Sequence, residues 1–131
     1  MPMCGACGDA SLTIAAWGPW GVVVPQEHGV VLYGGPRACD NEQLTAAVPQ
    51  LSPAASLNEE YGSLACCVEI VDGVEAAIRH IHAHGSGHTE AVVATDEGVI
   101  RRFLAAVDAA CVFANASTRF ADGYVAPLLC P

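Results

Sequence analysis

The segment 115–120 (NASTRF) places an amide, two hydroxyls and a guanidinium within six residues. It directly follows the apolar segment 111–114 (CVFA), which predicts a strand. Ligands of open parallel sheets bind beyond the carboxyl ends of the strands. Arginine binds carboxylate or phosphate through two parallel hydrogen bonds. The segment therefore predicts a site for an anionic substrate, and the alternative is an ordinary polar loop with Arg119 in solvent.

Two adjacent carboxylates, Glu59 and Glu60, stand just before an apolar segment at 64–71. A carboxylate in such a place can accept hydrogen bonds from the ribose hydroxyls of a dinucleotide. The alternative is an acidic turn in contact with water.

Histidine and cysteine spacings suggest metal or redox chemistry, but each supplies only part of the residues that such a site needs. His80 and His84 are four residues apart on a predicted helix, as in two-histidine metal sites. Zinc would need a third protein ligand, and the alternative is a polar helix end. Cys4 and Cys7 form a C-x-x-C that could be redox-active or half of a zinc site, but no second C-x-x-C accompanies it. We predict no metal site.

Three apolar segments predict strands that would carry these residues. They are 64–71 (LACCVEIV), 91–94 (AVVA) and 111–114 (CVFA), and a helical pattern separates each from the next. This β-α-β-α-β order predicts an α/β fold with a parallel sheet and right-handed crossovers.

The two intervening helices have local start and stop signals. Asp72, with Glu75 three residues later, predicts a capping box, and Gly85 predicts a left-handed helix end. Thr95 is the expected cap of the second helix. Its predicted buried stripe consists of Val99, Phe103, Leu104 and Val107.

The first half of the chain carries weaker signals. Residues 22–24 and 30–33 predict short strands, and Gly34-Gly35-Pro36 predicts a turn. Residues 37–58, which include two prolines, predict a surface connection with at most one helical turn.

Composition narrows the class of protein. Hydrophobic residues make up 53% of the 131 residues and the net charge is -9, which favours a packed domain. The excess of acidic side chains argues against nucleic acid and against anionic membranes as partners. The 7 cysteines are an odd number with irregular spacing, which predicts reduced thiols in an intracellular protein of the cytoplasm or an organelle.

Four segments, in order, resemble consecutive blocks of the γ-glutamyl phosphate reductases, members of the aldehyde dehydrogenase superfamily. They are VLYGGPRA (31–38), EEYGSLACCVEIVD (59–72), AAIRHIHAHGSGHTEAVVATD (76–96) and VDAACVFANASTRFADGY (107–124). The resemblance is closest to the reductase half of eukaryotic Δ1-pyrroline-5-carboxylate synthases. It implies a partial aldehyde-dehydrogenase-type catalytic domain and NADPH-dependent reduction of L-glutamyl 5-phosphate to glutamate 5-semialdehyde, a step of proline biosynthesis.

The resemblance also implies residue roles. Asn115, Ser117, Thr118 and Arg119 would meet the substrate, and Ser86, His88 and Thr89 would lie near the same cleft. Glu59 resembles the glutamate that holds the nicotinamide ribose, with Glu60 as the alternative register. The nucleophile of the family is a cysteine, which only Cys7 faintly matches.

The ends of the chain depart from the family pattern. We expect a divergent segment at 1–28, a partial reductase domain at 29–124 and a divergent tail at 125–131. We expect no counterpart of the family's dinucleotide-binding domain in these residues, and therefore a fragment that is inactive in isolation. The alternative is a non-catalytic module that forms a homo-oligomer or associates with the full-length reductase through unpaired sheet edges.

Overall fold

The fold alternates strands and helices in a computed structural model that describes residues 12–14 and 29–121. In chain order the elements are β1 (Leu12–Ile14), β2 (Val31–Gly34), α1 (Pro36–Cys39), α2 (Glu42–Ala47), β3 (Ser52–Pro53), β4 (Ala65–Glu69), α3 (Gly73–His84), β5 (Thr89–Val92), α4 (Glu97–Ala106), β6 (Cys111–Ala114) and the 3-10 turn η2 (Thr118–Ala121). Within this part of the chain no helix has the length and apolar character needed to cross a membrane. The strand predicted at 22–24 lies outside the described residues.

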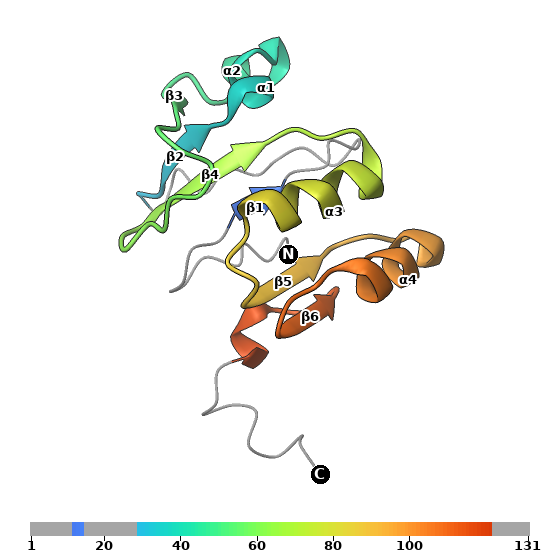
Figure 1. Ribbon diagram of the computed structural model, residues 1–131. Coiled ribbons are helices and arrows are strands. Elements are labelled where there is room, and N and C mark those ends of the chain that lie inside the picture. The colour runs from blue at the N-terminus through green and yellow to red at the C-terminus, as the bar shows by residue number, and fades with distance from the viewer. Residues whose placement is uncertain (1–11, 15–28, 122–131) are drawn as a thin grey trace.

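The strands form two parallel sheets (Figure 1). One has the order β1-β4-β2-β3, with Leu32 opposite Cys66, and the other pairs β5 with β6, with Ala91 opposite Phe113. The predicted β-α-β-α-β order is confirmed as β4-α3-β5-α4-β6. Because β4 and β5 belong to different hydrogen-bonded sheets, α3 links the two sheets rather than two neighbours of one sheet.

The first core packs α1 and α2 against β2 and β4. Its buried residues are Leu32, Ala38, Leu44, Val48, Cys66 and Val68. The prediction of a surface connection at 37–58 is therefore wrong. Pro36 occupies the first turn of α1, where its fixed φ suits a helix start, and Asn41 caps α2 by accepting a hydrogen bond from Leu44 N (2.8 Å). Leu44 and Val48, four residues apart, then face inward together.

The second core holds α3 and α4 on the β5–β6 sheet. Its buried residues are Ile78, Ile81, Phe103 and Val107. Phe103 and Val107 confirm the predicted stripe of α4, whereas Leu104 is 43% exposed. Successive helical residues point about 100° apart, so Phe103 and Leu104 do not both face this narrow contact.

The capping box predicted for α3 is wrong. Asp72 is the residue before the helix, but its side chain makes no cap hydrogen bond. Its carboxylate instead accepts two hydrogen bonds from Arg37 (2.8 and 2.9 Å). Glu75 pairs with Arg102 of α4 in the same bidentate way. Both carboxylates of the predicted capping box therefore pair with an arginine rather than with the backbone at the start of α3. A guanidinium can donate to both oxygens of a carboxylate at once, which makes such pairs favourable.

Two further end signals differ from the prediction. Asp96, not Thr95, caps α4, and it accepts hydrogen bonds from the backbone nitrogens of Gly98 (2.7 Å) and Val99 (3.0 Å). Helix α3 ends at His84 as predicted, but Gly85 is extended, with a φ of -72°. Its glycine character has a steric reason instead, since a Cβ there would lie 2.8 Å from Ile81 O.

Glu69, at the end of β4, is the buried acidic residue of the first core and is 5% exposed. Its Oε1 accepts hydrogen bonds from Ala38 N (3.0 Å) and Ile70 N (2.8 Å). Gly35 has no side chain with which to cap α1, and a Cβ at that position would collide with Glu69 Oε2. A carboxylate from β4 thus takes the place of the missing cap.

Candidate functional site

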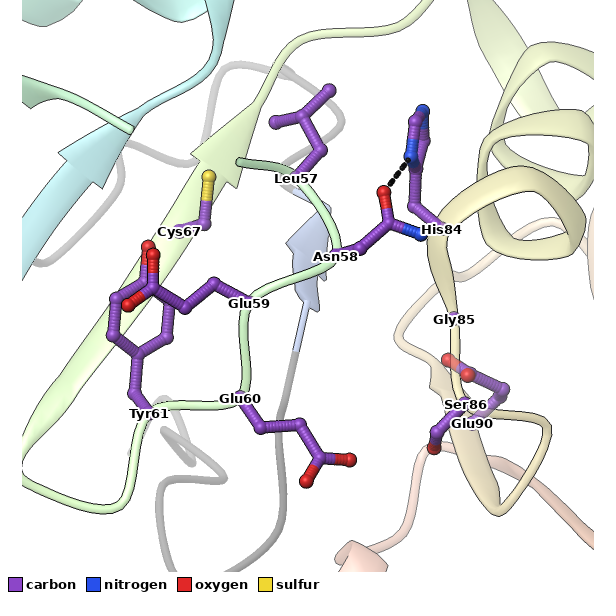
Figure 2. A pocket seen from close by; sticks show the side chains of 10 residues that line it. All are labelled: Leu57, Asn58, Glu59, Glu60, Tyr61, Cys67, His84, Gly85, Ser86 and Glu90. Atoms are coloured by element: carbon purple, nitrogen blue, oxygen red, sulfur yellow. Dashed lines mark hydrogen bonds between the residues drawn. The ribbon is translucent and has the colours of Figure 1, made fainter. Parts of the chain in front are cut away.

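A cavity of about 220 Å³ opens between the β3–β4 connection and the end of α3 (Figure 2). One wall comes from the connection and β4, and the other from the turn between α3 and β5. The lining residues are Leu57, Asn58, Glu59, Glu60, Tyr61, Cys67, His84, Gly85, Ser86 and Glu90. Three residues predicted for binding, Glu59, Glu60 and Ser86, therefore meet in one cavity.

The carboxylates of Glu59 and Glu60 are available to a ligand. Both residues are exposed, and neither carboxylate has a hydrogen-bond partner among the residues that the structure describes. Figure 2 shows them on the same stretch of the β3–β4 connection. Carboxylates accept hydrogen bonds only, so the pair suits a donor such as a sugar hydroxyl.

Glu90 contributes a third carboxylate from β5, in a different environment. Burial raises the pKa of this carboxyl. A Cβ at Gly85 would lie 2.9 Å from Glu90 Oε1, so the carboxyl packs closely against the backbone of that turn. Burial without a compensating partner disfavours the charged form.

We expect Glu90→Gln to stabilise the chain at pH 7.5 and to have almost no effect at pH 4. A carboxyl whose pKa is raised on folding favours the fold while protonated and loses that contribution as the pH rises above its unfolded pKa of 4.5. Glutamine is neutral at every pH and removes this loss. Urea denaturation of both chains across this pH range measures the difference.

Glu97→Gln is the control for this experiment. Its carboxylate is 84% exposed and pairs with Arg101 at 3.1 Å, so its removal should slightly destabilise the chain at pH 7.5. A gain from Glu90→Gln that stays the same at pH 4 and pH 7.5 would contradict the burial argument.

Tyr61 and Cys67 line the cavity in their neutral forms. Burial raises the pKa of Tyr61 to about 12 and the pKa of Cys67 to about 11. Near pH 7 only about one in ten thousand Cys67 side chains would be thiolate, so Cys67 is a poor nucleophile. Tyr61 stacks on Tyr33 of β2, with ring centroids 5.2 Å apart. Cys7, the predicted nucleophile, lies outside the described residues.

The residues of the turn between α3 and β5 divide into two groups. Ser86 lines the cavity, whereas the side chains of His88 and Thr89 form a hydrogen bond with each other, between Nδ1 and Oγ1, at 2.6 Å. A second hollow of about 290 Å³ lies beside the same turn and is lined by Ile81, His82, Gly85, Ser86, Gly87 and Asp108. Ser86 is thus shared by both hollows.

The 115–119 loop folds back so that η2 packs beside β5 (Figure 1). Asn115 has a φ of 53°, and its amide holds both backbone groups of Ala94, accepting from N (3.0 Å) and donating to O (2.9 Å). Ser117 Oγ accepts a hydrogen bond from Arg119 N (3.2 Å). Asn115 therefore shapes the loop, while the exposed Arg119 guanidinium has no carboxylate partner in the described part of the chain.

His80 and His84 lie on the same face of α3, with their ring centroids 4.7 Å apart. Across residues 12–14 and 29–121 no group of three potential ligands comes together. Burial and the neighbouring His84 lower the pKa of His80, and His84 Nδ1 is bonded to Asn58 Oδ1 at 2.9 Å.

Sequence reasoning missed several lining residues, above all Glu90, His84 and Asn58. Glu90 had a usable signal, since it is an acidic residue at the head of an otherwise apolar strand. The sequence contains no signal that Asn58 and His84 would be in contact, because 26 residues separate them.

Comparison with known proteins identifies relatives over most of the chain. It is 48% identical over 103 residues to "Delta-1-pyrroline-5-carboxylate synthase" from Solanum lycopersicum, covering 79% of this chain and 13% of that protein. It is 48% identical over 91 residues to "Gamma-glutamyl phosphate reductase" from Syntrophomonas wolfei, covering 68% of this chain and 21% of that protein. No family model matches the chain.

Solved structures give the same relationship. The γ-glutamyl phosphate reductase of Thermotoga maritima matches with a TM-score of 0.66 and 33% identity over 76% of this chain and 23% of the other. The Saccharomyces cerevisiae enzyme of the same name matches with a TM-score of 0.54 and 26% identity, over 76% of this chain and 26% of the other. The fold is thus of the aldehyde dehydrogenase type. Over about three quarters of its length, this chain is homologous to the γ-glutamyl phosphate reductases and the Δ1-pyrroline-5-carboxylate synthases.

Proposed function

We propose that residues 29–121 form part of the active site of an NADPH-dependent reductase that converts L-glutamyl 5-phosphate to L-glutamate 5-semialdehyde in proline biosynthesis. The observation that carries this proposal is the 48% identity to a γ-glutamyl phosphate reductase over 91 residues. Identity at that level over a folded domain supports a shared site as well as a shared fold.

The cavity fits one part of a dinucleotide. Its volume of about 220 Å³ is below the roughly 300–1,000 Å³ of a complete ligand pocket, which suits a subsite for a single sugar. Glu59 and Glu60 offer carboxylates without a hydrogen-bond partner in the described part of the chain as acceptors for ribose hydroxyls. When bound, the cofactor supplies the hydride, and these residues orient its nicotinamide ribose.

The substrate needs cationic and donor groups for its phosphate and carboxylate. Arg119 offers a guanidinium that has no carboxylate partner among the described residues, and Thr118 and Ser117 offer hydroxyls on the same loop. Ser86 adds a hydroxyl from the cavity wall. Asn115, His88 and Thr89, proposed from the family resemblance to lie at the same site, would shape it through the contacts described above.

The test is a chimera, the Thermotoga maritima reductase with residues 29–121 of this chain in place of its matching segment. We expect NADPH oxidation within about tenfold of the parent enzyme when glutamate 5-kinase supplies the substrate. A folded chimera without turnover would refute the proposal. The isolated chain spans 21% of the length of the Syntrophomonas wolfei reductase, and we expect it to show no turnover.

A second candidate is a non-catalytic module that binds the full-length reductase or a second copy of itself. Exposed apolar side chains favour it, with Val93 84% and Phe120 47% exposed near the β5–β6 sheet. Light scattering and titration with the full-length enzyme test it. A stable monomer without affinity for the reductase would exclude this candidate.

A further inference from the structure

The acidic stretch of the cavity lies between two anchored residues. On one side, Asn58 contacts the end of α3, and on the other, Tyr61 stacks on Tyr33 with an angle of 8° between the rings. Glu59 and Glu60 are the two residues between these anchors. Figure 2 shows the Asn58–His84 bond on one side of the cavity and Tyr61 on the other.

The Asn58 anchor consists of two hydrogen bonds with defined directions. His84 Nδ1 donates to Asn58 Oδ1 at 2.9 Å, because an amide oxygen only accepts. Asn58 Nδ2 donates to Ala83 O at 3.5 Å, which occupies one of the carbonyls left unpaired at the end of α3. Ser56 Oγ also accepts from Asn58 N at 3.1 Å and fixes the backbone before the carboxylates.

We propose that Asn58 and His84 are positioning residues that hold the Glu59–Glu60 carboxylates against the cofactor's ribose. This inference rests on the proposed function. The contact joins the two walls of the cavity, because Asn58 belongs to the β3–β4 connection and His84 to α3. Without it, the connection keeps the Tyr61 stack and the Ser56 bond, but the stretch that carries Glu59 and Glu60 loses its hydrogen bonds to the end of α3, which forms the opposite wall.

The expected result is a change in cofactor KM rather than in kcat. In the chimera, Asn58→Ala and His84→Phe should each raise the KM for NADPH about three- to tenfold, the range set by one net hydrogen bond. Both should leave kcat within about twofold and the KM for L-glutamyl 5-phosphate unchanged, because the lost contact serves binding of the cofactor. His84→Gln keeps an N–H donor and should recover part of the loss.

The two substitutions should also be non-additive. If the contact is the shared cause, the double variant will be no worse than Asn58→Ala alone, because Asn58→Ala already removes the bond to His84. The matched control is Asn41→Ala, which removes the cap of α2 in the other core. It should lower the melting temperature and leave the KM for NADPH unchanged, so a change in stability alone cannot imitate the expected result.

Glu59→Gln and Glu60→Gln in the same chimera separate the two possible failures. If these raise the KM for NADPH while Asn58→Ala and His84→Phe do not, the positioning role is wrong and the proposed function stands. If none of the four raises it, the assignment of the cavity to the cofactor is wrong, and the positioning role falls with it.

Discussion

Replacing Glu69 with alanine is expected to lower the free energy of unfolding by about 3 kcal/mol. The substitution leaves Ala38 N and Ile70 N without their acceptor in a core where Glu69 is 5% exposed. Each buried donor without a partner costs about 1–3 kcal/mol. The start of α1 also loses the carboxylate that replaces its missing cap. Urea denaturation of the whole chain at neutral pH measures the change.

Two variants show whether the acceptor or the charge is responsible. Glu69→Gln keeps an oxygen for both nitrogens and should cost less than half as much as alanine. Glu60→Ala removes an exposed carboxylate that makes no hydrogen bond or ion pair in the described part of the chain and should change stability by less than about 0.5 kcal/mol. A loss below about 0.5 kcal/mol for Glu69→Ala would contradict the structural role of this carboxylate.

The strands show how far apolar runs can predict the fold. Residues 111–114 were predicted with the bounds of β6, and β4 lies inside the predicted 64–71. Strand β5 begins at Thr89, two residues before the predicted start. The prediction missed Thr89 and Glu90 because these residues are too polar to belong to the apolar run. It stops before Ala94, whose backbone groups are taken by the Asn115 amide.

The elements missed from the sequence depend on distant partners. Helix α1 begins at Pro36, and the backbone nitrogen of Ala38 in its first turn donates to the carboxylate of Glu69. These two residues are 31 positions apart in the sequence. The side chain of Asp72 was predicted to cap α3, but it forms an ion pair with Arg37, which is 35 residues away in the sequence. Propensity and spacing describe short-range preferences, so contacts at such separations override them without a local signal.

The sequence predicted several residues of the candidate site but not the contacts that these residues make. Family resemblance selected Glu59, Glu60 and Ser86, and the structure brings them to one cavity. The roles of these residues remain predictions. The amide of Asn115, which was predicted to meet the substrate, is hydrogen-bonded to both backbone groups of Ala94, and its role toward a substrate stays a prediction. A positive φ is common for asparagine, which explains its place at this sharp turn.

Arg119→Ala in the chimera is expected to lower kcat/KM for L-glutamyl 5-phosphate by at least about tenfold. A charge-assisted hydrogen bond is worth about 1.5–3 kcal/mol, which corresponds to roughly 10- to 150-fold. The guanidinium has no carboxylate partner among residues 12–14 and 29–121, so it is free to meet an anionic substrate. Arg119→Lys should recover only part of the loss, since lysine keeps the charge but not the planar fork.

A structural role for Arg119 would give a different result. If its side chain held the loop, the alanine variant would lose activity together with a large drop in melting temperature. The described contacts argue against this, because the loop is held by the Asn115 amide and by the bond from Arg119 N to Ser117 Oγ, which alanine preserves. Arg101→Ala, which removes the same charge from α4, is the matched control and should leave kcat/KM unchanged. Unchanged kinetics in Arg119→Ala would end the assignment of this loop to the substrate.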